Sequence, residues 1–146
     1  VIPAHPSFVE KGYLVEDMKY LSNYKLMEVL NGFRISTDHW DTALSNGHLV
    51  YLIGTDDSHD VTDVSDVAKR FTMINAPENE AELLLQALEN GNAVGVDFQL
   101  RKNETLENKI QRLEKDLPYI KQVELRGDTL LISASKKIGT IKISTI

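Results

Sequence analysis

The first two thirds of the chain combine short apolar runs with segments whose apolar residues recur at helical spacing. The apolar runs cover residues 26–30, 49–53, 71–75 and 93–98. Their length and near-continuous hydrophobicity predict strands that are buried in a sheet. Residues 37–45 and 78–90 carry an apolar stripe, acidic residues near their start and an Asn-Gly pair directly after or at their end, which predicts two helices.

Two further elements are expected near the start of the chain. Residues 1–4 are mostly apolar and run into His5-Pro6, which predicts the end of a buried strand that Pro6 terminates. Residues 15–21 have the apolar spacing of a short helix. Residues 1–98 therefore alternate between strand and helix, which is typical of a parallel α/β sheet or barrel.

The pattern changes after Phe98. Residues 103–116 are highly charged with a narrow apolar stripe, which predicts a solvated amphipathic helix. Three short strands with turn residues between them are expected next: residues 120–125, 129–133 and 138–143. We therefore expect two domains, an α/β domain over residues 1–98 and a helix with a small antiparallel β module over residues 99–146.

Composition excludes several classes of protein. The chain has 146 residues, no cysteine, 16 basic and 22 acidic residues, and a formal net charge of −6. The absence of cysteine excludes disulfide scaffolds, thiolate zinc sites and cysteine nucleophiles. The negative charge argues against binding along a nucleic-acid backbone, and no apolar run approaches the roughly 20 residues of a membrane helix.

Both ends of the chain resemble the interior of a protein. The chain starts without methionine in an apolar segment, and it closes on an alternating strand pattern at residues 141–146. Natural termini are usually looser and more polar. We therefore expect a piece of a longer polypeptide, whose targeting signal or membrane anchor, if it has one, lies outside this sequence. The compartment stays open.

Polar residues with chemical potential follow two of the predicted strands. His5 follows the first strand, and Asp57-Ser58-His59 follows the strand at residues 49–53. In parallel α/β folds, ligands bind at the carboxyl ends of the strands. Residues two apart in an extended chain point to the same side, so Asp57 and His59 could grip one cation, and a His/Asp mixture suits zinc, manganese or iron.

Each of these residues also has a structural interpretation. Asp57 and His59 could form a turn with a helix-capping carboxylate and a solvated imidazole, and His5 could be a hydrogen-bonded turn residue. Glu28 lies within an apolar strand, where a carboxylate is costly unless it is paired or binds metal. The alternative for Glu28 is a solvent-facing position on an edge strand.

The remaining histidines and aspartates are weaker candidates. His39 is expected to decorate a helix start, and His48 is expected to be structural. The loop that follows residue 53 is rich in aspartate: Asp56, Asp57, Asp60, Asp63 and Asp66. Its spacing does not match an EF-hand, although a calcium site is an open alternative. Support for a neighbouring metal site is the better interpretation, with Asp56 as a candidate ligand or supporting residue.

Four motifs occur in the order and spacing of the PHP (polymerase and histidinol phosphatase) superfamily. They are residues 2–6 (IPAHP), 26–31 (LMEVLN), 40–47 (WDTALSNG) and 54–60 (GTDDSHD). The chain resembles the stand-alone bacterial metal-dependent phosphoesterases of that superfamily over about residues 1–98. Residues 80–91 are similar to the closing helix of the family.

The resemblance implies a fold and an activity. The fold would be the carboxyl-terminal part of a distorted, seven-stranded, TIM-like β/α barrel, with residues 99–146 as a small appendage. His5, Asp57 and His59 would be metal ligands, Asp57 and His59 also belonging to the catalytic site, with Glu28 at or near it. Two or three zinc, manganese or iron ions would activate a water for hydrolysis of a small phosphate ester.

Two departures from the family pattern matter. The opening His-x-His ligands of the family would lie in an amino-terminal half that this sequence lacks, so we expect weak metal binding and little activity from the piece alone. The Phe-Tyr-Ala-Ser-type stretch of the family is replaced here by residues 92–98 (NAVGVDF). The second interpretation is therefore a non-catalytic binding module on a degenerate domain.

Overall fold

The structure is a computed structural model that describes residues 1–98, 101–116 and 119–136. The described residues form two compact units that divide between Phe98 and Arg101. Among the helices of these ranges, none combines the length and the apolar character that a bilayer-crossing segment requires.

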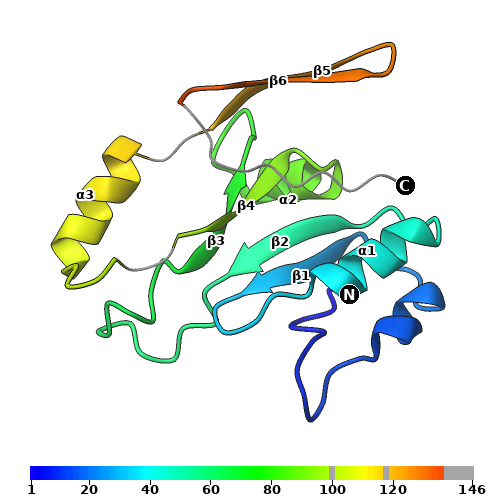
Figure 1. Ribbon diagram of the computed structural model, residues 1–146, viewed down its shortest axis with the longest axis horizontal. Helices are drawn as coiled ribbons and strands as arrows, with labels where there is room; N and C mark the ends of the chain where they lie inside the picture. Colours follow the sequence, from blue (N-terminus) through cyan, green and yellow to red (C-terminus); the bar gives the residue numbers. More distant parts are fainter. Residues whose placement is uncertain (99–100, 117–118, 137–146) are drawn as a thin grey trace. The chain divides into compact units, whose positions relative to one another are not determined.

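The first unit contains a 3-10 helix, two α-helices and four strands (Figure 1). In chain order they are η1 (Val15–Lys19), β1 (Leu26–Asn31), α1 (Thr37–Ser45), β2 (Tyr51–Thr55), β3 (Arg70–Ile74), α2 (Ala81–Glu89) and β4 (Ala93–Asp97). The apolar runs and helical stripes of the sequence thus predict the right type of element at these places, with bounds that differ by a few residues.

Strands β1 and β2 form a parallel pair. Leu26 lies opposite Tyr51 and Asn31 opposite Thr55, with one irregularity between Glu28 and Leu30. Figure 1 shows the two arrows side by side and pointing the same way. Both strands therefore end at the same edge, and the residues that follow them meet there.

The hydrophobic core lies between this strand pair and the helices η1 and α1. Its buried members are Met18, Met27, Val29, Ala43 and Val50. Trp40 packs against them, and its indole Nε1 donates a hydrogen bond to the Val50 carbonyl at 2.8 Å. Burial of each larger side chain stabilises the fold by about 1.5–3 kcal/mol, which holds α1 on the sheet.

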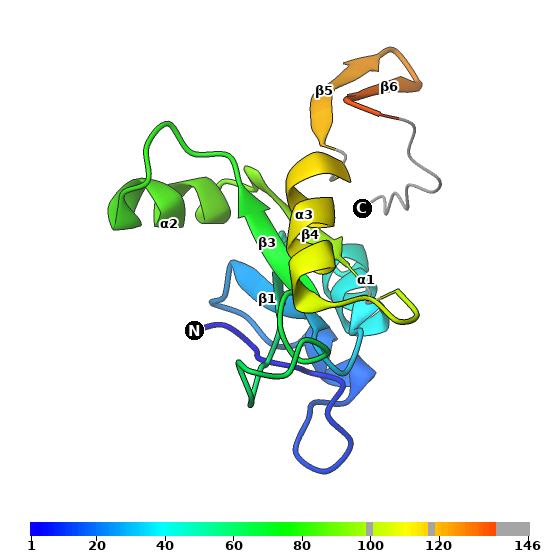
Figure 2. The same cartoon turned by 90° about the vertical axis from the view of Figure 1, so that its left-hand side faces the viewer.

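The expected seven-stranded barrel is wrong. The six strands of the described residues form three separate two-stranded sheets, and no barrel is present among them. Strands β3 and β4 run antiparallel, with Arg70 opposite Asp97 and Ile74 opposite Ala93. Figure 2 shows α2 projecting beside this pair.

The structure gives a physical reason for the missing closure. The outer edge of β1 is already covered, because the Glu28 N–H donates to the Pro3 carbonyl at 3.1 Å and the Ser36 N–H donates to the Val29 carbonyl at 2.8 Å. The apolar start of the chain thus lies along β1, although it is not a regular strand. A strand whose edge bonds are taken cannot accept the next strand of a barrel.

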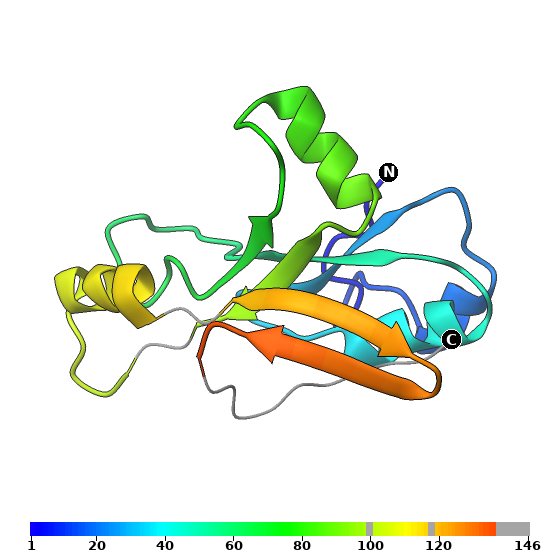
Figure 3. The same cartoon turned by 90° about the horizontal axis from the view of Figure 1, so that it is seen from above.

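The second unit consists of α3 (Leu106–Asp116) and a hairpin of β5 (Ile120–Arg126) and β6 (Thr129–Ala134). Figure 3 shows the two strands of the hairpin running in opposite directions. Gly127 adopts φ +57 in the tight turn between the two strands, where the sequence predicts turn residues. The strand expected at residues 138–143 lies outside the described residues.

Candidate functional site

A buried carboxylate organises the shared edge of β1 and β2. Glu28 is only 6% exposed and accepts hydrogen bonds from the His5 backbone N–H, the Thr55 hydroxyl and the Asn31 side-chain amide, the last at 3.1 Å. The solvent-facing alternative for Glu28 is therefore wrong. Both oxygens of Glu28 accept hydrogen bonds and so hold neighbouring residues in place, while its expected position at or near a metal site stays a prediction.

Asn31 links this carboxylate to Asp57. Its side-chain Nδ2 also donates to Asp57 Oδ2 at 3.1 Å, and its Oδ1 accepts from the Phe33 N–H at 3.1 Å. Asn31 is not among the residues expected at the site. The signal in the sequence is an Asn directly after an apolar run, where a side-chain amide that becomes buried needs polar partners.

The two strand ends are also in close backbone contact. A Cβ atom added at Gly32 would lie 1.7 Å from the Asp56 carbonyl oxygen. Only glycine allows the chain after β1 to approach the chain after β2 this closely.

Asp57 and His59 lie beside one another. The distance between His59 Nε2 and Asp57 Oδ1 is 3.7 Å, so the expected convergence of the two side chains is present. The expected reason for it is wrong, because Asp57 has φ +50 and is not extended. The side chains approach through a left-handed turn after β2.

Two of the five described non-glycine residues with positive φ are candidate residues, and the other three are Asn23, Ala68 and Asn103. His5 (φ +30) and Asp57 (φ +50) both adopt the left-handed region, which is unfavourable for residues with a Cβ. Each costs on the order of 1 kcal/mol, and such residues persist where their surroundings hold them. Here Glu28 accepts a hydrogen bond from the His5 N–H, and Asn31 donates one to Asp57, so both residues are held in this conformation. Strained residues held in this way are common at functional sites.

Asp56 holds the segment that follows β2. Its carboxylate accepts three successive backbone N–H groups, from Ala68 at 2.6 Å, Lys69 at 2.7 Å and Arg70 at 2.9 Å. These bonds tie the end of β2 to the start of β3. The expected part of Asp56 at a metal site, as a ligand or as a supporting residue, stays a prediction.

The other two histidines anchor the beginning of the chain. His39 Nε2 lies 2.9 Å from the Tyr13 carbonyl, and His48 Nε2 lies 3.1 Å from the Lys19 carbonyl. His39 lies in α1 and His48 precedes β2, so these contacts tie α1 and the start of β2 to the segment around η1. His39 and His48 are structural residues, as the sequence analysis predicts.

The side chains of His5, Asp57 and His59 offer donor atoms that transition metals prefer, but the described residues do not bring three such side chains together. His5 Nδ1 is buried and has no hydrogen-bond partner among the described residues, as expected for an atom reserved for a ligand. Asp57 Oδ1 and His59 Nε2 supply a carboxylate and a second imidazole. Within the described residues, however, no group of three or more His, Asp or Glu side chains converges enough to hold an ion.

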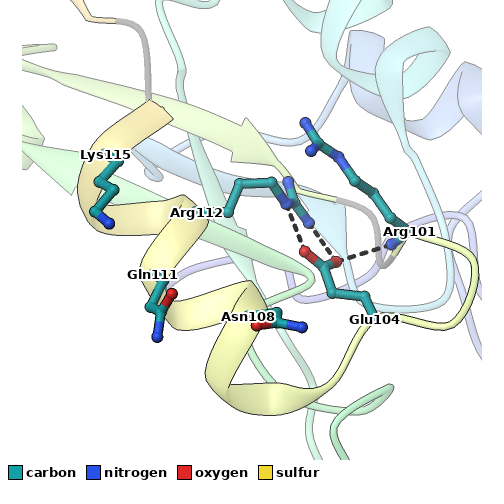
Figure 4. A pocket seen from close by; sticks show the side chains of 6 residues that line it. All are labelled: Arg101, Glu104, Asn108, Gln111, Arg112 and Lys115. Carbon is teal, nitrogen blue, oxygen red and sulfur yellow. Dashed lines mark hydrogen bonds and ion pairs between the residues drawn. The ribbon is translucent and has the colours of Figure 1, made fainter.

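A separate polar pocket lies on α3 in the second unit (Figure 4). It is lined by Arg101, Glu104, Asn108, Gln111, Arg112 and Lys115. Arg112 donates through Nε and Nη2 to the two oxygens of Glu104, each at 2.7 Å. The guanidinium of Arg112 lowers the pKa of Glu104 to about 2.

This pKa makes part of the stability of α3 depend on acidity. A carboxylate with a lowered pKa stabilises the fold above its unfolded value near 4.5, and the contribution is lost as the pH falls from there towards 2. Glu104→Gln should therefore lower the melting temperature of α3 at pH 7 and remove this acid dependence. Nuclear magnetic resonance (NMR) amide signals of α3 would measure both effects, with Glu114→Gln as control. Identical acid dependence in Glu104→Gln and the parent would contradict the assignment.

Comparisons of this chain with protein-family models, with curated proteins and with solved structures find no match.

Proposed function

We propose that the chain carries part of a metal-dependent phosphoesterase site, which hydrolyses a small phosphate ester with a metal-activated water. The observation that carries the proposal is the 3.7 Å approach of Asp57 Oδ1 and His59 Nε2 at the shared end of two parallel strands. The resemblance of four ordered motifs to PHP phosphoesterases supports the same chemistry. The proposal concerns the site and does not depend on a barrel.

The roles of the residues follow from their contacts. Asp57 and His59 would hold the ion, which by the chemistry of these donors would be zinc, manganese or iron. The unpartnered Nδ1 of His5 is a third donor of the right kind, although the described residues do not bring it together with the other two. When bound, such an ion lowers the pKa of a water and neutralises charge on a phosphoryl group. Asn31 occupies Asp57 Oδ2 and so leaves Oδ1 facing His59.

The proposal includes further ligands from outside this sequence. Among the described residues only Asp57 and His59 come together, and a site with two or three ions needs more donors. The partner of this chain would be the amino-terminal half of the same polypeptide, as the resemblance implies. The substrate would be a small phosphorylated molecule.

The test measures metal content and hydrolysis of the longest natural polypeptide that contains this chain. Asp57→Ala and His59→Ala should each reduce bound manganese or zinc and lower kcat/KM on a panel of phosphate esters by roughly 100-fold or more. His48→Gln is the matched control, since the imidazole of His48 contacts the Lys19 backbone carbonyl and lies outside the proposed site. Metal content and hydrolysis that stay unchanged in both Asp57 and His59 variants would refute the proposal and favour a binding module.

A further inference from the structure

Asp66 holds the backbone that carries His59. Its Oδ2 accepts hydrogen bonds from the His59 N–H at 2.6 Å and the Asp60 N–H at 2.9 Å, and from the Ser58 hydroxyl at 3.3 Å. Three successive residues are thus fixed by one oxygen of one carboxylate. Neither the sequence motifs nor the roles proposed above use this residue.

The second oxygen of Asp66 extends the contact to Lys69. Lys69 Nζ lies 2.8 Å from Asp66 Oδ1, and both side chains are largely buried, at 12% and 13% exposure. A carboxylate has enough acceptor positions for all four of these contacts.

Lys69 leads back to the His59 ring through an aromatic side chain. Its Nζ lies 4.1 Å from the centre of the Phe33 ring, a cation–π contact. The Phe33 ring lies 6.1 Å from the His59 imidazole, inclined at 44°. The contacts form a closed circuit: His59 backbone, Asp66, Lys69, Phe33 and His59 ring.

His59 needs such support because its side chain is 76% exposed. An imidazole with so little packing would otherwise sample several rotamers, and ordering it on metal binding would reduce the affinity. We propose that Asp66, Lys69 and Phe33 are positioning residues that fix the His59 imidazole beside Asp57 before a cation binds. This inference deepens the proposed function and rests on it.

The experiment uses NMR of the metal-free protein and titration with Mn²⁺ alone. Asp66→Ala should release the His59 side chain into rotamer averaging and weaken Mn²⁺ binding roughly tenfold. Lys69→Met keeps the length of the side chain but removes the ammonium, and it should weaken binding roughly two- to tenfold. Asp66→Asn keeps one carbonyl acceptor and should recover part of the loss.

Asp63→Asn is the matched control, because Asp63 lies in the same loop and its carboxylate accepts hydrogen bonds from Ser65. A His59 side chain that stays equally ordered in the parent protein and in Asp66→Ala would overturn the positioning role. Failure of the parent protein to bind Mn²⁺ would instead refute the proposed function. Even if the parent protein does not bind Mn²⁺, the rotamer measurement still tests whether Asp66 positions the His59 side chain.

Discussion

Glu28→Ala is expected to lower the free energy of unfolding of the first unit by about 3 kcal/mol. The substitution leaves three donors without their acceptor: the His5 N–H, the Asn31 amide and the Thr55 hydroxyl. Each buried donor that loses its partner costs about 1–3 kcal/mol, and removal of a buried charge offsets part of the sum. Urea unfolding followed by the fluorescence of Trp40, the only tryptophan, would measure the change.

Two further variants make this result specific. Glu28→Gln keeps one carbonyl acceptor in the same position, so it should lower the free energy of unfolding by about half as much as Glu28→Ala does. Glu10→Ala removes an exposed glutamate and should change the free energy of unfolding by less than about 0.5 kcal/mol. If Glu28→Ala were no more destabilising than Glu10→Ala, Glu28 would not organise the edge of the sheet.

Asp56→Ala is expected to open the segment between β2 and β3 at a cost of about 3 kcal/mol. Three backbone N–H groups, at Ala68, Lys69 and Arg70, lose a charged acceptor. Hydrogen bonds to charged groups contribute about 1.5–3 kcal/mol each, and water recovers part of this because Asp56 is half-buried. Amide hydrogen exchange at these three residues should accelerate by roughly 100-fold.

The same variant separates a supporting role of Asp56 from a ligand role. A supporting carboxylate changes amide exchange in the metal-free protein, whereas a pure ligand changes only metal binding. Asp63→Ala serves as the control in the same loop, and its amides at residues 68–70 should exchange as in the parent protein. Unchanged exchange at these residues in Asp56→Ala would show that the carboxylate does not hold the loop.

The local pattern of the sequence was sufficient for the elements but not for their pairing. The strands and helices expected over residues 26–97 are confirmed, because the spacing of apolar residues and the turn residues at the end of each element are local signals. The direction of β4 against β3 was wrong, since the connection of residues 75–92 is long enough for either a parallel or an antiparallel pair. The covering of β1 by Pro3 and Ser36 depends on contacts between distant residues that no local pattern reports.

The residues of the candidate site could also be predicted only in part from the sequence. The approach of Asp57 and His59 is predicted for the wrong reason, because a left-handed turn rather than an extended strand produces it. Asn31 was missed, because an Asn before a Gly is equally typical of a simple turn. The support that Asp66 gives to residues 58–60 spans a loop, and sequence spacing alone does not reveal it.

Gly32 has a consequence for the spacing of the two strand tips. Its backbone lies so close to the Asp56 carbonyl that even a methyl group would collide there. Any residue other than glycine at position 32 would therefore push the two strand tips apart and separate Asn31 from Asp57. The aspartate-rich loop on the other side is held at two points, by the hydrogen bonds that Asp56 and Asp66 accept.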